Sequence, residues 1–547
     1  MRLINSRTLK FHEFEQSSSS VPPYAILSHT WGEGEVTFRD MSSGSPQAIT
    51  RKKGYAKITQ TCRLARENDL EYVWIDTCCI DKSSSAELSE SINSMFMWYG
   101  NAATCYVFLS DFITGKTKLG DCRWWTRGWT LQELLAPKNL TFYDATWKPV
   151  GTKITLITRI AKITRIREAV LWDKREILLC PVSQRMSWAA FRQTTRVEDE
   201  AYCLLGIFGI HLPLLYGEGR MAFRRLQEEI IRRNIDLTIF FWHATEDRAN
   251  IDDEPQCMSL FAESPSVFGM VKSITPVISG FPEFFITNKG VFFSHVVYYV
   301  SEAKVPRTNF VLYRFFLGRD SNRLPAGILL RKIGPGIFCR ARHPPILGDL
   351  SHLPPKTSDS SFYIVPDPGP NIGVSLAHYR RNAFHLPSNE QFQLQRAVPR
   401  HLWDATDSIF LREPKNAFEF GGLQAIQYPG IVAMEIVARI KSAHVNLIIL
   451  SEGDDRSPIH SVKVFDGQQH PKEVELLFGV QNEENSIPLA DFRKHMANIA
   501  SLSNRVEVLL RPSNQRASIS VSLKPRTLRV MWEAVSVSDF VFTVVEL

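Results

Sequence analysis

Short apolar segments alternate with helical segments over the first 143 residues, and this alternation restricts the fold more than any other feature of the chain. The apolar segments have the length of buried strands, and the segments between them carry apolar residues at helical spacing. The expected strands are residues 24–29, 71–76, 103–109 and 140–143, and the expected helices are residues 55–69, 84–99 and 129–135. This order predicts an α/β fold with a parallel sheet flanked by helices.

Two local signals support the helix assignments. Ser84 and Glu87 have the spacing of a capping box at the start of the second helix. Pro137 stops the third helix, because proline cannot continue helical hydrogen bonding.

Residues 151–242 predict a helical annex to the sheet. Thr195 and Glu198 have capping-box spacing ahead of a helix that carries Ala201 and Phe208 on its apolar face. A later helix at residues 221–233 places most of its arginines away from its apolar face. We expect those arginines to be solvated, although a partner or phosphate surface is the alternative.

Residues 243–256 form a polar and acidic segment that we expect to be a linker. The pattern of apolar residues changes after it from helical spacing to short β-type runs. Gly290 lies in a predicted hairpin turn within residues 284–297. The other expected strands are residues 309–317, 431–437, 445–450, 474–478, 506–510 and 540–545. We expect a β-rich, sandwich-like domain at 257–547, interrupted by a long surface loop at about 343–370.

Length and composition limit the class of protein. A chain of 547 residues exceeds one ordinary core, so we expect two or three domains, with two favoured. The expected segments are a lead-in at 1–23, the α/β domain at 24–150, the annex at 151–242 and the β-rich part at 257–547. A net charge of +7 is too dilute to imply nucleic-acid binding. Nine cysteines give no disulfide framework, and neither a signal peptide nor a membrane span is expected. These features favour a soluble protein in the reducing cytoplasm.

Polar clusters follow each expected strand, and in an open α/β sheet the carboxyl ends of the strands are where ligands bind. Ser28, His29 and Trp31 follow the first strand, and Asp76 follows the second. The segment 127–133 leads into the third helix. We therefore expect these groups to converge on one edge of the sheet.

Three ordered motifs among these clusters resemble a known family. They are AILSHTW at 25–31, VWIDTCCID at 73–81 and RGWTLQE at 127–133. Together they resemble the HET domain of fungal heterokaryon incompatibility proteins, a module that triggers cell death in nonself recognition. QRMSWA at 184–189 and LLYGEG at 214–219 extend the similarity to about residue 242.

The resemblance carries an expectation about chemistry. HET domains are regarded as distant relatives of TIR domains, and residues 129–134 are similar to the segment in which enzymatic TIR domains hold a catalytic glutamate. The resemblance thus implies a TIR-like sheet, Glu133 as the catalytic residue, and NAD as a substrate rather than a cofactor. A carboxylate beside the ribose can stabilise the positive charge that develops when the bond to nicotinamide breaks.

The same resemblance places the remaining site residues around a nucleotide. Ser28 and His29 would line the pocket with Asp76 and Arg127, while Trp31 or Trp129 could stack on a ring.

Structural roles compete with these assignments. Glu133 could instead cap a helix or pair with Arg127, and Asp76 is expected to cap the helix that follows it. Trp74, Trp98, Trp124 and Trp125 are expected to pack in the core.

Other chemistries have weaker support. Cys78 or Cys79 could act as a nucleophile with His29 as base, but adjacent cysteines at a strand end are more often packed as small hydrophobic residues. No CxxC or HExxH spacing suggests zinc, so we expect no metal.

Two functional hypotheses follow. In the first, the N-terminal domain self-associates and kills or arrests the cell by consuming NAD or a related nucleotide, and the β-rich region sets when that happens. In the second, the domain is a non-enzymatic interaction module that recruits a death-signalling partner, such as another incompatibility or immune protein. A catabolic hydrolase or transferase has no supporting motif.

Overall fold

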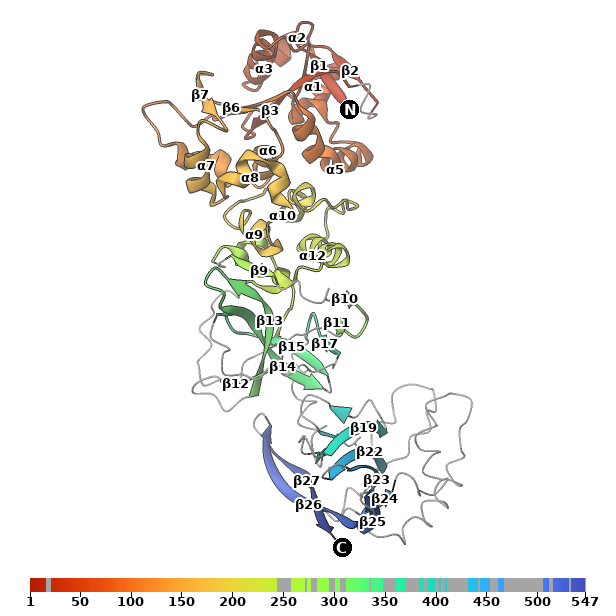
Figure 1. Cartoon of the computed structure of the whole chain (residues 1–547). Helices are drawn as coiled ribbons and strands as arrows, with labels where there is room; N and C mark the ends of the chain where they lie inside the picture. Colours follow the sequence, from red (N-terminus) through yellow and green to blue (C-terminus); the bar gives the residue numbers. More distant parts are fainter. Residues whose placement is uncertain are drawn as a thin grey trace.

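The computed structural model confirms the expected α/β sheet in the N-terminal part (Figure 1). The described residues are 1–15, 21–243, 257–270, 273–276, 283–294, 301–304, 311–334, 336–347 and 361–368, followed by 383–386, 392–398, 403–404, 409–410, 431–440, 443–452, 461–466, 505–510, 515–530 and 533–546. The sheet of the N-terminal part has seven strands in the order β2-β1-β4-β3-β5-β6-β7.

Four parallel strands form the centre of this sheet, and all four were predicted. They are β3 (Tyr24–His29), β4 (Tyr72–Trp74), β5 (Thr104–Phe108) and β6 (Leu140–Tyr143). Numbered among themselves, they have the order 2-1-3-4, because β3 pairs with both β4 and β5. In sheets of this order the connections leave to opposite sides between the first and third strands, which creates a crevice at their carboxyl ends. His29 and Phe108 are register partners at that point.

Antiparallel strands close both edges of the sheet. The segment expected to be only a lead-in supplies β1 (Arg2–Asn5), which pairs with β4, and β2 (Phe11–Glu13). On the other edge, β7 (Pro149–Thr152) pairs with β6. The prediction missed β1 because its four residues are too few for a periodic signal, and β4, the strand that joins it to the sheet, is about 70 residues away.

Helices connect the strands, as expected for an α/β fold. They are α1 (Phe38–Ser43), α2 (Pro46–Thr50), α3 (Tyr55–Glu67), α4 (Asp76–Cys79), α5 (Ser85–Asn101) and α6 (Thr130–Leu135), with short 3-10 turns η1 (Leu119–Asp121) and η2 (Arg123–Thr126). The predicted face of α3 is buried, including Ile58, Cys62 and Ala65.

The capping box predicted for α5 is half formed. Ser84 accepts a hydrogen bond from the backbone of Glu87, as predicted. The Glu87 carboxylate is directed elsewhere, because it accepts from the backbone of Asp81 at 2.8 Å and pairs with Arg2 at 2.8 Å. A tertiary ion pair to β1 thus replaces one local capping bond.

The annex is helical, as predicted, but more broken than expected. Its elements are α7 (Ile157–Thr164), α8 (Glu168–Trp172), η3 (Lys174–Ile177), α9 (Val182–Ser187), α10 (Asp199–Tyr202), α11 (Leu205–Phe208), α12 (Met221–Arg233) and η4 (Leu237–Phe240). The Thr195–Glu198 capping box is wrong. Glu198 instead accepts backbone hydrogen bonds from Gly217 and Gly219, so it holds the glycine-rich turn of the LLYGEG segment.

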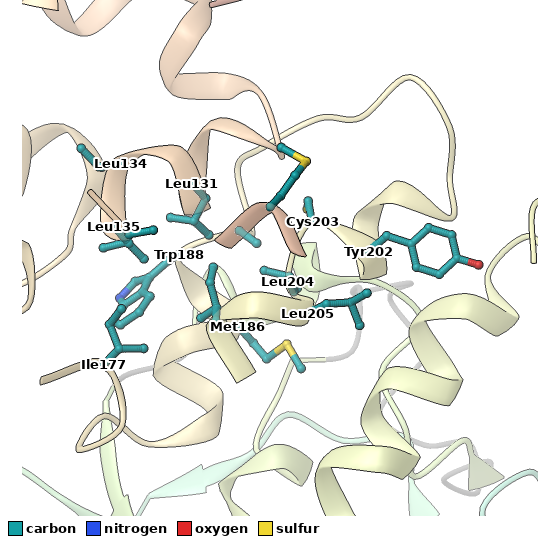
Figure 2. Close-up of a cluster of buried hydrophobic side chains, with 14 of the residues drawn as sticks. Leu131, Leu134, Leu135, Ile177, Met186, Trp188, Tyr202, Cys203, Leu204 and Leu205 are labelled. Carbon is teal, nitrogen blue, oxygen red and sulfur yellow. The ribbon is translucent and has the colours of Figure 1, made fainter. Parts of the chain in front are cut away.

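The annex packs directly on α6, the helix that contains Glu133. Figure 2 shows leucines of α6 in one buried cluster with side chains from α9 and from the segment between α10 and α11. The labelled members are Leu131, Leu134, Leu135, Ile177, Met186, Trp188, Tyr202, Cys203, Leu204 and Leu205. A sheet helix of six residues is therefore stabilised largely by tertiary burial.

The predicted arginine-rich helix is α12, with the expected bounds. Its arginines are paired with acidic side chains rather than merely solvated: Arg225 contacts Glu218 at 2.5 Å, and Arg224 contacts both Glu228 and Asp367.

A ten-stranded sheet follows the annex within the described residues. Its strands are β8 (Cys257–Met258), β9 (Ile274–Pro276), β10 (Glu283–Ile286), β11 (Val291–Ser294), β12 (Ser301–Lys304), β13 (Val311–Asp320), β14 (Pro325–Gly334), β15 (Ile337–Ala341), β16 (Ile346–Leu347) and β17 (Phe362–Ile364). The predicted hairpin is β10–β11, and Gly290 in its turn has φ of +146°. Strands β16 and β17 lie within the segment expected to be a long loop, of which residues 348–360 are outside the described part.

Further strands confirm that the C-terminal part is β-rich. They are β18 (Ala383–His385), β19 (Phe392–Val398), β20 (Trp403–Asp404), β21 (Ile409–Phe410), β22 (Ile431–Ile440), β23 (Ala443–Glu452), β24 (Ser461–Asp466), β25 (Arg505–Leu510), β26 (Gln515–Val530) and β27 (Glu533–Glu546). The expected strand at 474–478 and all of the expected linker except His243 lie outside the described residues.

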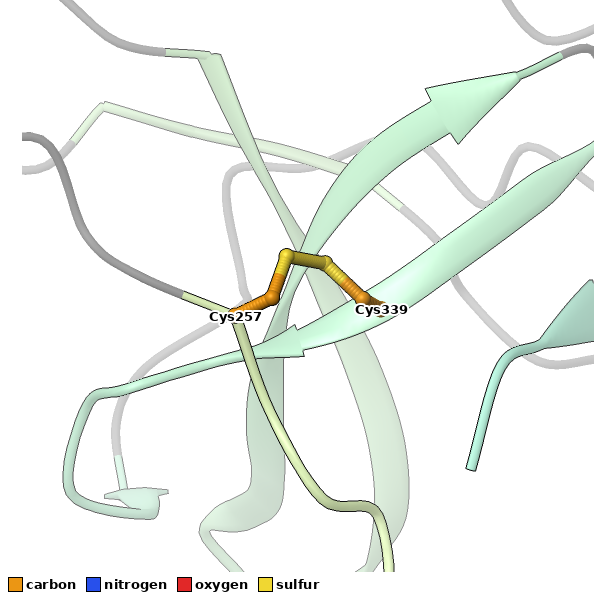
Figure 3. The surroundings of a disulfide bond; sticks show 2 residues. All are labelled: Cys257 and Cys339. Carbon is orange, nitrogen blue, oxygen red and sulfur yellow. A yellow bond between two sulfur atoms is a disulfide. The ribbon is translucent and has the colours of Figure 1, made fainter. Parts of the chain in front are cut away.

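Cys257 and Cys339 form a disulfide that joins β8 to β15 (Figure 3). No disulfide was expected, because the two cysteines are 82 residues apart and only the pairing of β8 with β15 brings them together. The other seven cysteines are free and buried.

The annex and the ten-stranded sheet share a core. Arg340 of β15 is fully buried, and its guanidinium donates to the carbonyls of Phe240 at 3.0 Å and Trp242 at 2.5 Å. In the described part of the chain, no helix is both long enough and apolar enough to cross a membrane.

Candidate functional site

Ser28 and Glu133 meet at the carboxyl end of β3, although 105 residues separate them in the chain. The Ser28 hydroxyl donates to Oε2 of Glu133 and accepts from the Trp124 indole N–H at 2.8 Å. Ser28 is fully buried, and Glu133 is only 4% exposed. A strand end, a 3-10 turn and α6 thus contribute one side chain each to a chain of hydrogen bonds.

The environment of Glu133 favours its neutral form. Burial, followed by the charge of Asp76, raises the pKa of Glu133 to about 8, against the opposing effects of the Ser28 hydrogen bond and of Arg127 and Arg192. Tyr99 donates to the carbonyl of Leu27 at 3.0 Å and faces the same carboxyl. A strongly raised pKa in a buried carboxyl that lies beside the end of a strand is typical of residues in functional sites.

His29, the next residue of β3, lies between two carboxylates. Its Nε2 is 3.8 Å from Glu35 and its Nδ1 is 3.8 Å from Asp76. Neither ring nitrogen has a hydrogen-bond partner in the structure. Burial and the charge of Lys57 lower the pKa of His29 to about 3, against the attraction of Glu35, so the ring is neutral at physiological pH. Lys57 in turn pairs with Glu35.

Asp76 connects this buried group to the surface. Its Oδ2 accepts from the indole N–H of Trp31 at 2.8 Å. The capping role expected for Asp76 is wrong, because Ile75 is the N-cap of α4 and makes no side-chain capping bond. Trp31 is 43% exposed, and the Lys82 ammonium lies 3.3 Å from the centre of its ring. The edge therefore presents an aromatic ring and a cation, and the ring is hydrogen-bonded to Asp76.

Arg127 and Trp129 face the annex rather than Ser28. The Arg127 guanidinium donates to the Thr195 hydroxyl at 3.3 Å, so Glu133 does not depend on it for an ion pair. The Trp129 side chain hydrogen-bonds to Asp199, the first residue of α10. Of the two tryptophans proposed to stack on a ring, Trp31 is the one on the open edge.

Gly128, between these two residues, is required by close packing. A Cβ at this position would lie 2.5 Å from Cγ2 of Thr194 and 3.1 Å from the sulfur of Cys203. The RGW motif is thus the contact surface of the sheet domain with the annex.

The thiol chemistry considered above has no support in the geometry. Cys78 is fully buried, and its hydrogen bond with Cys79, followed by burial, raises the pKa of the Cys78 thiol well above its usual value. The sulfur of Cys79 accepts from the backbone of Ile75. Within the described part of the chain, no three His, Cys, Asp or Glu side chains gather as a metal site.

Several residues of this site were not predicted. Trp124 was expected only to pack, and its hydrogen bond to Ser28 depends on a turn that no local pattern specifies. Glu35 and Lys57 were overlooked, although Glu35 follows the first motif by four residues. Glu35 could have been found from its closeness to the first motif. No feature of the sequence indicated that Lys57 belongs to the site.

Comparison with known proteins bears on the same segment. Residues 24–112 match the family of heterokaryon incompatibility proteins (HET). The chain is also 46% identical over 226 residues to vegetative incompatibility protein HET-E-1 of Podospora anserina, in an alignment that covers 39% of this chain. The N-terminal part of this chain is a HET domain. The family match contains Ser28, His29 and Asp76 and ends before Glu133.

The similarity to HET-E-1 covers only part of each protein. The alignment spans 16% of the length of HET-E-1, so this chain matches only a small part of that protein. Residues 221–285 match a domain of unknown function, DUF8212, which begins at α12 and reaches β10 beyond the HET domain. No solved structure matches the chain.

Proposed function

We propose that this chain is an incompatibility effector that kills or arrests the cell, and that its HET domain does so by cleaving NAD at the Ser28–Glu133 site. One observation carries the proposal: a buried carboxyl with a strongly raised pKa is hydrogen-bonded to a strand-end hydroxyl at the crevice of a 2-1-3-4 sheet. The resemblance of residues 129–134 to the glutamate segment of TIR domains supports the choice of reaction.

The reaction is a hydrolysis. Water attacks C1′ of the ribose, the bond from C1′ to the nicotinamide nitrogen breaks, and the products are neutral nicotinamide, ADP-ribose and one proton. Positive charge develops on the ribose as the bond breaks, and an ionised Glu133 stabilises that charge. The positive charge of the substrate also lowers the pKa of an adjacent carboxyl, so binding itself favours the ionised form of Glu133.

The other side chains of the edge have roles consistent with a nucleotide. Trp31 offers an exposed ring for stacking, and Lys82, whose ammonium lies against that ring, offers a cation to a phosphate. Glu133 and Ser28 are closed from solvent in this structure, and we propose that self-association of the HET domain opens the site. In this reading the closed state is the resting state of the effector.

The test is nicotinamide release from NAD by the purified full chain at high protein concentration. The wild type should release nicotinamide with equimolar ADP-ribose, and Glu133→Gln should abolish release, because glutamine keeps the shape but cannot ionise. Glu67→Gln is the matched control, since Glu67 pairs with Arg63 on the surface of α3. Equal rates in wild type and Glu133→Gln would remove Glu133 from the reaction.

A second candidate function is a contact module that recruits a death-signalling partner. The observation that favours it is that Ser28 and Glu133 are buried while Trp31 is 43% exposed, which leaves an aromatic surface suited to protein contact. Expression in cells separates the two functions. A folded Glu133→Gln protein that is still toxic, together with a Trp31→Ala protein that is not, would favour contact over catalysis.

A further inference from the structure

Arg192 of the annex lies against the segment that holds Glu133. Its Nη1 donates to the carbonyl of Arg127 and to the hydroxyl of Thr130, each at 2.9 Å. Its Nε donates to the carbonyl of Trp188 in the annex at 3.2 Å. Arg192, a partly buried residue, thus joins the annex to the start of α6 through its guanidinium.

Thr130 extends this connection to Trp124, the residue whose indole donates a hydrogen bond to Ser28. The Thr130 hydroxyl donates to the carbonyl of Trp124 at 2.6 Å, and Trp124 donates through its indole to Ser28. Two hydrogen bonds, through the Thr130 hydroxyl, therefore connect Arg192 to Trp124, the residue that donates to Ser28. Arg192 also lies at the start of the helix that contains Glu133.

Backbone pairing holds Arg192 in place. Gln193 forms a parallel β-bridge with Arg127, in which Gly128 N–H donates to the Gln193 carbonyl at 2.9 Å and Gln193 N–H donates to the Thr126 carbonyl at 2.6 Å. Gly128 and Arg192 also line a hollow of about 60 Å³. Ser264, which precedes the η5 turn (Pro265–Phe268) of the downstream region, and Ser266 within that turn line it as well.

We propose that Arg192 is a positioning residue for Glu133: from the annex, its guanidinium holds the turn between Trp124 and α6 and so sets where the Glu133 carboxyl lies relative to Ser28. The kinetic consequence rests on the proposed NAD cleavage, whereas the positioning itself does not. The annex is then part of the functional unit, and the HET-family match, which ends at residue 112, contains only the strand-end half of the site.

Charge gives Arg192 a second effect that a purely structural residue would lack. The charged groups that act on the pKa of Glu133 are Asp76 from α4, which raises it, and Arg127 and Arg192, which lower it. Tyr99 and Cys105 face Glu133 as neutral groups. Loss of the Arg192 charge should therefore raise the pKa of Glu133 further.

The indole N–H of Trp124 reports this ionisation, because it donates to the hydroxyl that donates to Glu133. The experiment is a pH titration of the full chain labelled with ¹⁵N-tryptophan, with the Trp124 signal assigned by Trp124→Phe. In the wild type the signal should shift with a midpoint near pH 8, and in Glu133→Gln the transition should be absent. Arg192→Gln should move the midpoint to higher pH, and Arg192→Lys, which keeps the charge, should restore it.

The matched control is Arg196→Gln, because Arg196 lies over the ring of Tyr216 and should leave the midpoint unchanged. A midpoint for Arg192→Gln equal to that of the wild type would overturn the proposal. Nicotinamide release distinguishes the two claims: Arg192→Gln should lower kcat by roughly tenfold or more with little change in KM, as expected when a catalytic group is misplaced. If the wild type releases no nicotinamide but the midpoint shifts as described, NAD cleavage fails and the positioning role stands.

Discussion

Replacing Glu133 by glutamine should change how the stability of the protein depends on pH, and the structure gives the size of the effect. In the folded state the pKa of Glu133 is raised from 4.5 to about 8. Below pH 4.5 the carboxyl is neutral in both folded and unfolded states, so its contribution to stability is fully present. Between pH 4.5 and 8 only the unfolded state ionises, and stability falls as pH rises.

Each pH unit between the two pKa values is worth about 1.4 kcal/mol, so the interval of about 3.5 units costs the wild type on the order of 5 kcal/mol by pH 8. Glutamine has no proton to lose and escapes this cost. Glu133→Gln should therefore be close to wild type at pH 5 and markedly more stable at pH 9. The buried His29 lowers the stability of the protein over a different interval, as pH falls from 6.5 towards 3, because only the unfolded state is protonated there. This effect is the same in wild type and Glu133→Gln.

The assay is urea unfolding at pH 5, 7 and 9, followed by the fluorescence of the buried tryptophans. Glu133→Ala serves as a contrast, because it leaves the Ser28 hydroxyl without its acceptor and should cost about 1–3 kcal/mol at pH 5, where glutamine costs little. Parallel stability curves for wild type and Glu133→Gln from pH 5 to pH 9 would refute the claim that burial keeps this carboxyl neutral.

Three further predictions follow from the same contacts. If Glu133 must be ionised, kcat/KM for NAD should rise with pH and level off above about pH 8; a flat profile from pH 6 to 9 would mean that ionisation of Glu133 is not required. Gly128→Ala should destabilise the protein by about 1–3 kcal/mol in denaturant unfolding, because its Cβ would lie 2.5 Å from Thr194 Cγ2. Adding Thr194→Ser, which removes that methyl group, should recover part of the loss. Full stability of Gly128→Ala would contradict the contact. Trp31→Ala should raise KM for NAD, because the exposed ring is the proposed stacking surface, and Trp31→Phe should keep most of the affinity. An unchanged KM would remove Trp31 from the binding site.

The central strands were predictable because their signal is local. Strand β3 is buried along its whole length, and such strands appear in a sequence as apolar runs without alternation. Once the order of strands and helices was known, the meeting of Ser28 and Glu133 at one edge followed from the geometry of parallel sheets. That step required no information about side-chain packing.

The failed predictions concern side chains that are held by tertiary contacts. Glu87 has the correct spacing for a capping box, but Arg2 offers a charged partner that a local pattern does not reveal. Glu198 binds the backbone of Gly217 and Gly219 instead of capping its own helix. Arg192 has no motif around it, and its role depends on a bridge between segments 66 residues apart.

The most direct test of the account is to measure NAD content and cell death together in cells that express the full chain. Wild type and Glu133→Gln should be expressed at equal levels, with Glu67→Gln as control. We predict that NAD falls before death in cells with wild type or Glu67→Gln, and that neither occurs with Glu133→Gln. Cell death caused by Glu133→Gln while NAD remains intact would contradict the proposed mechanism and would favour recruitment of a partner.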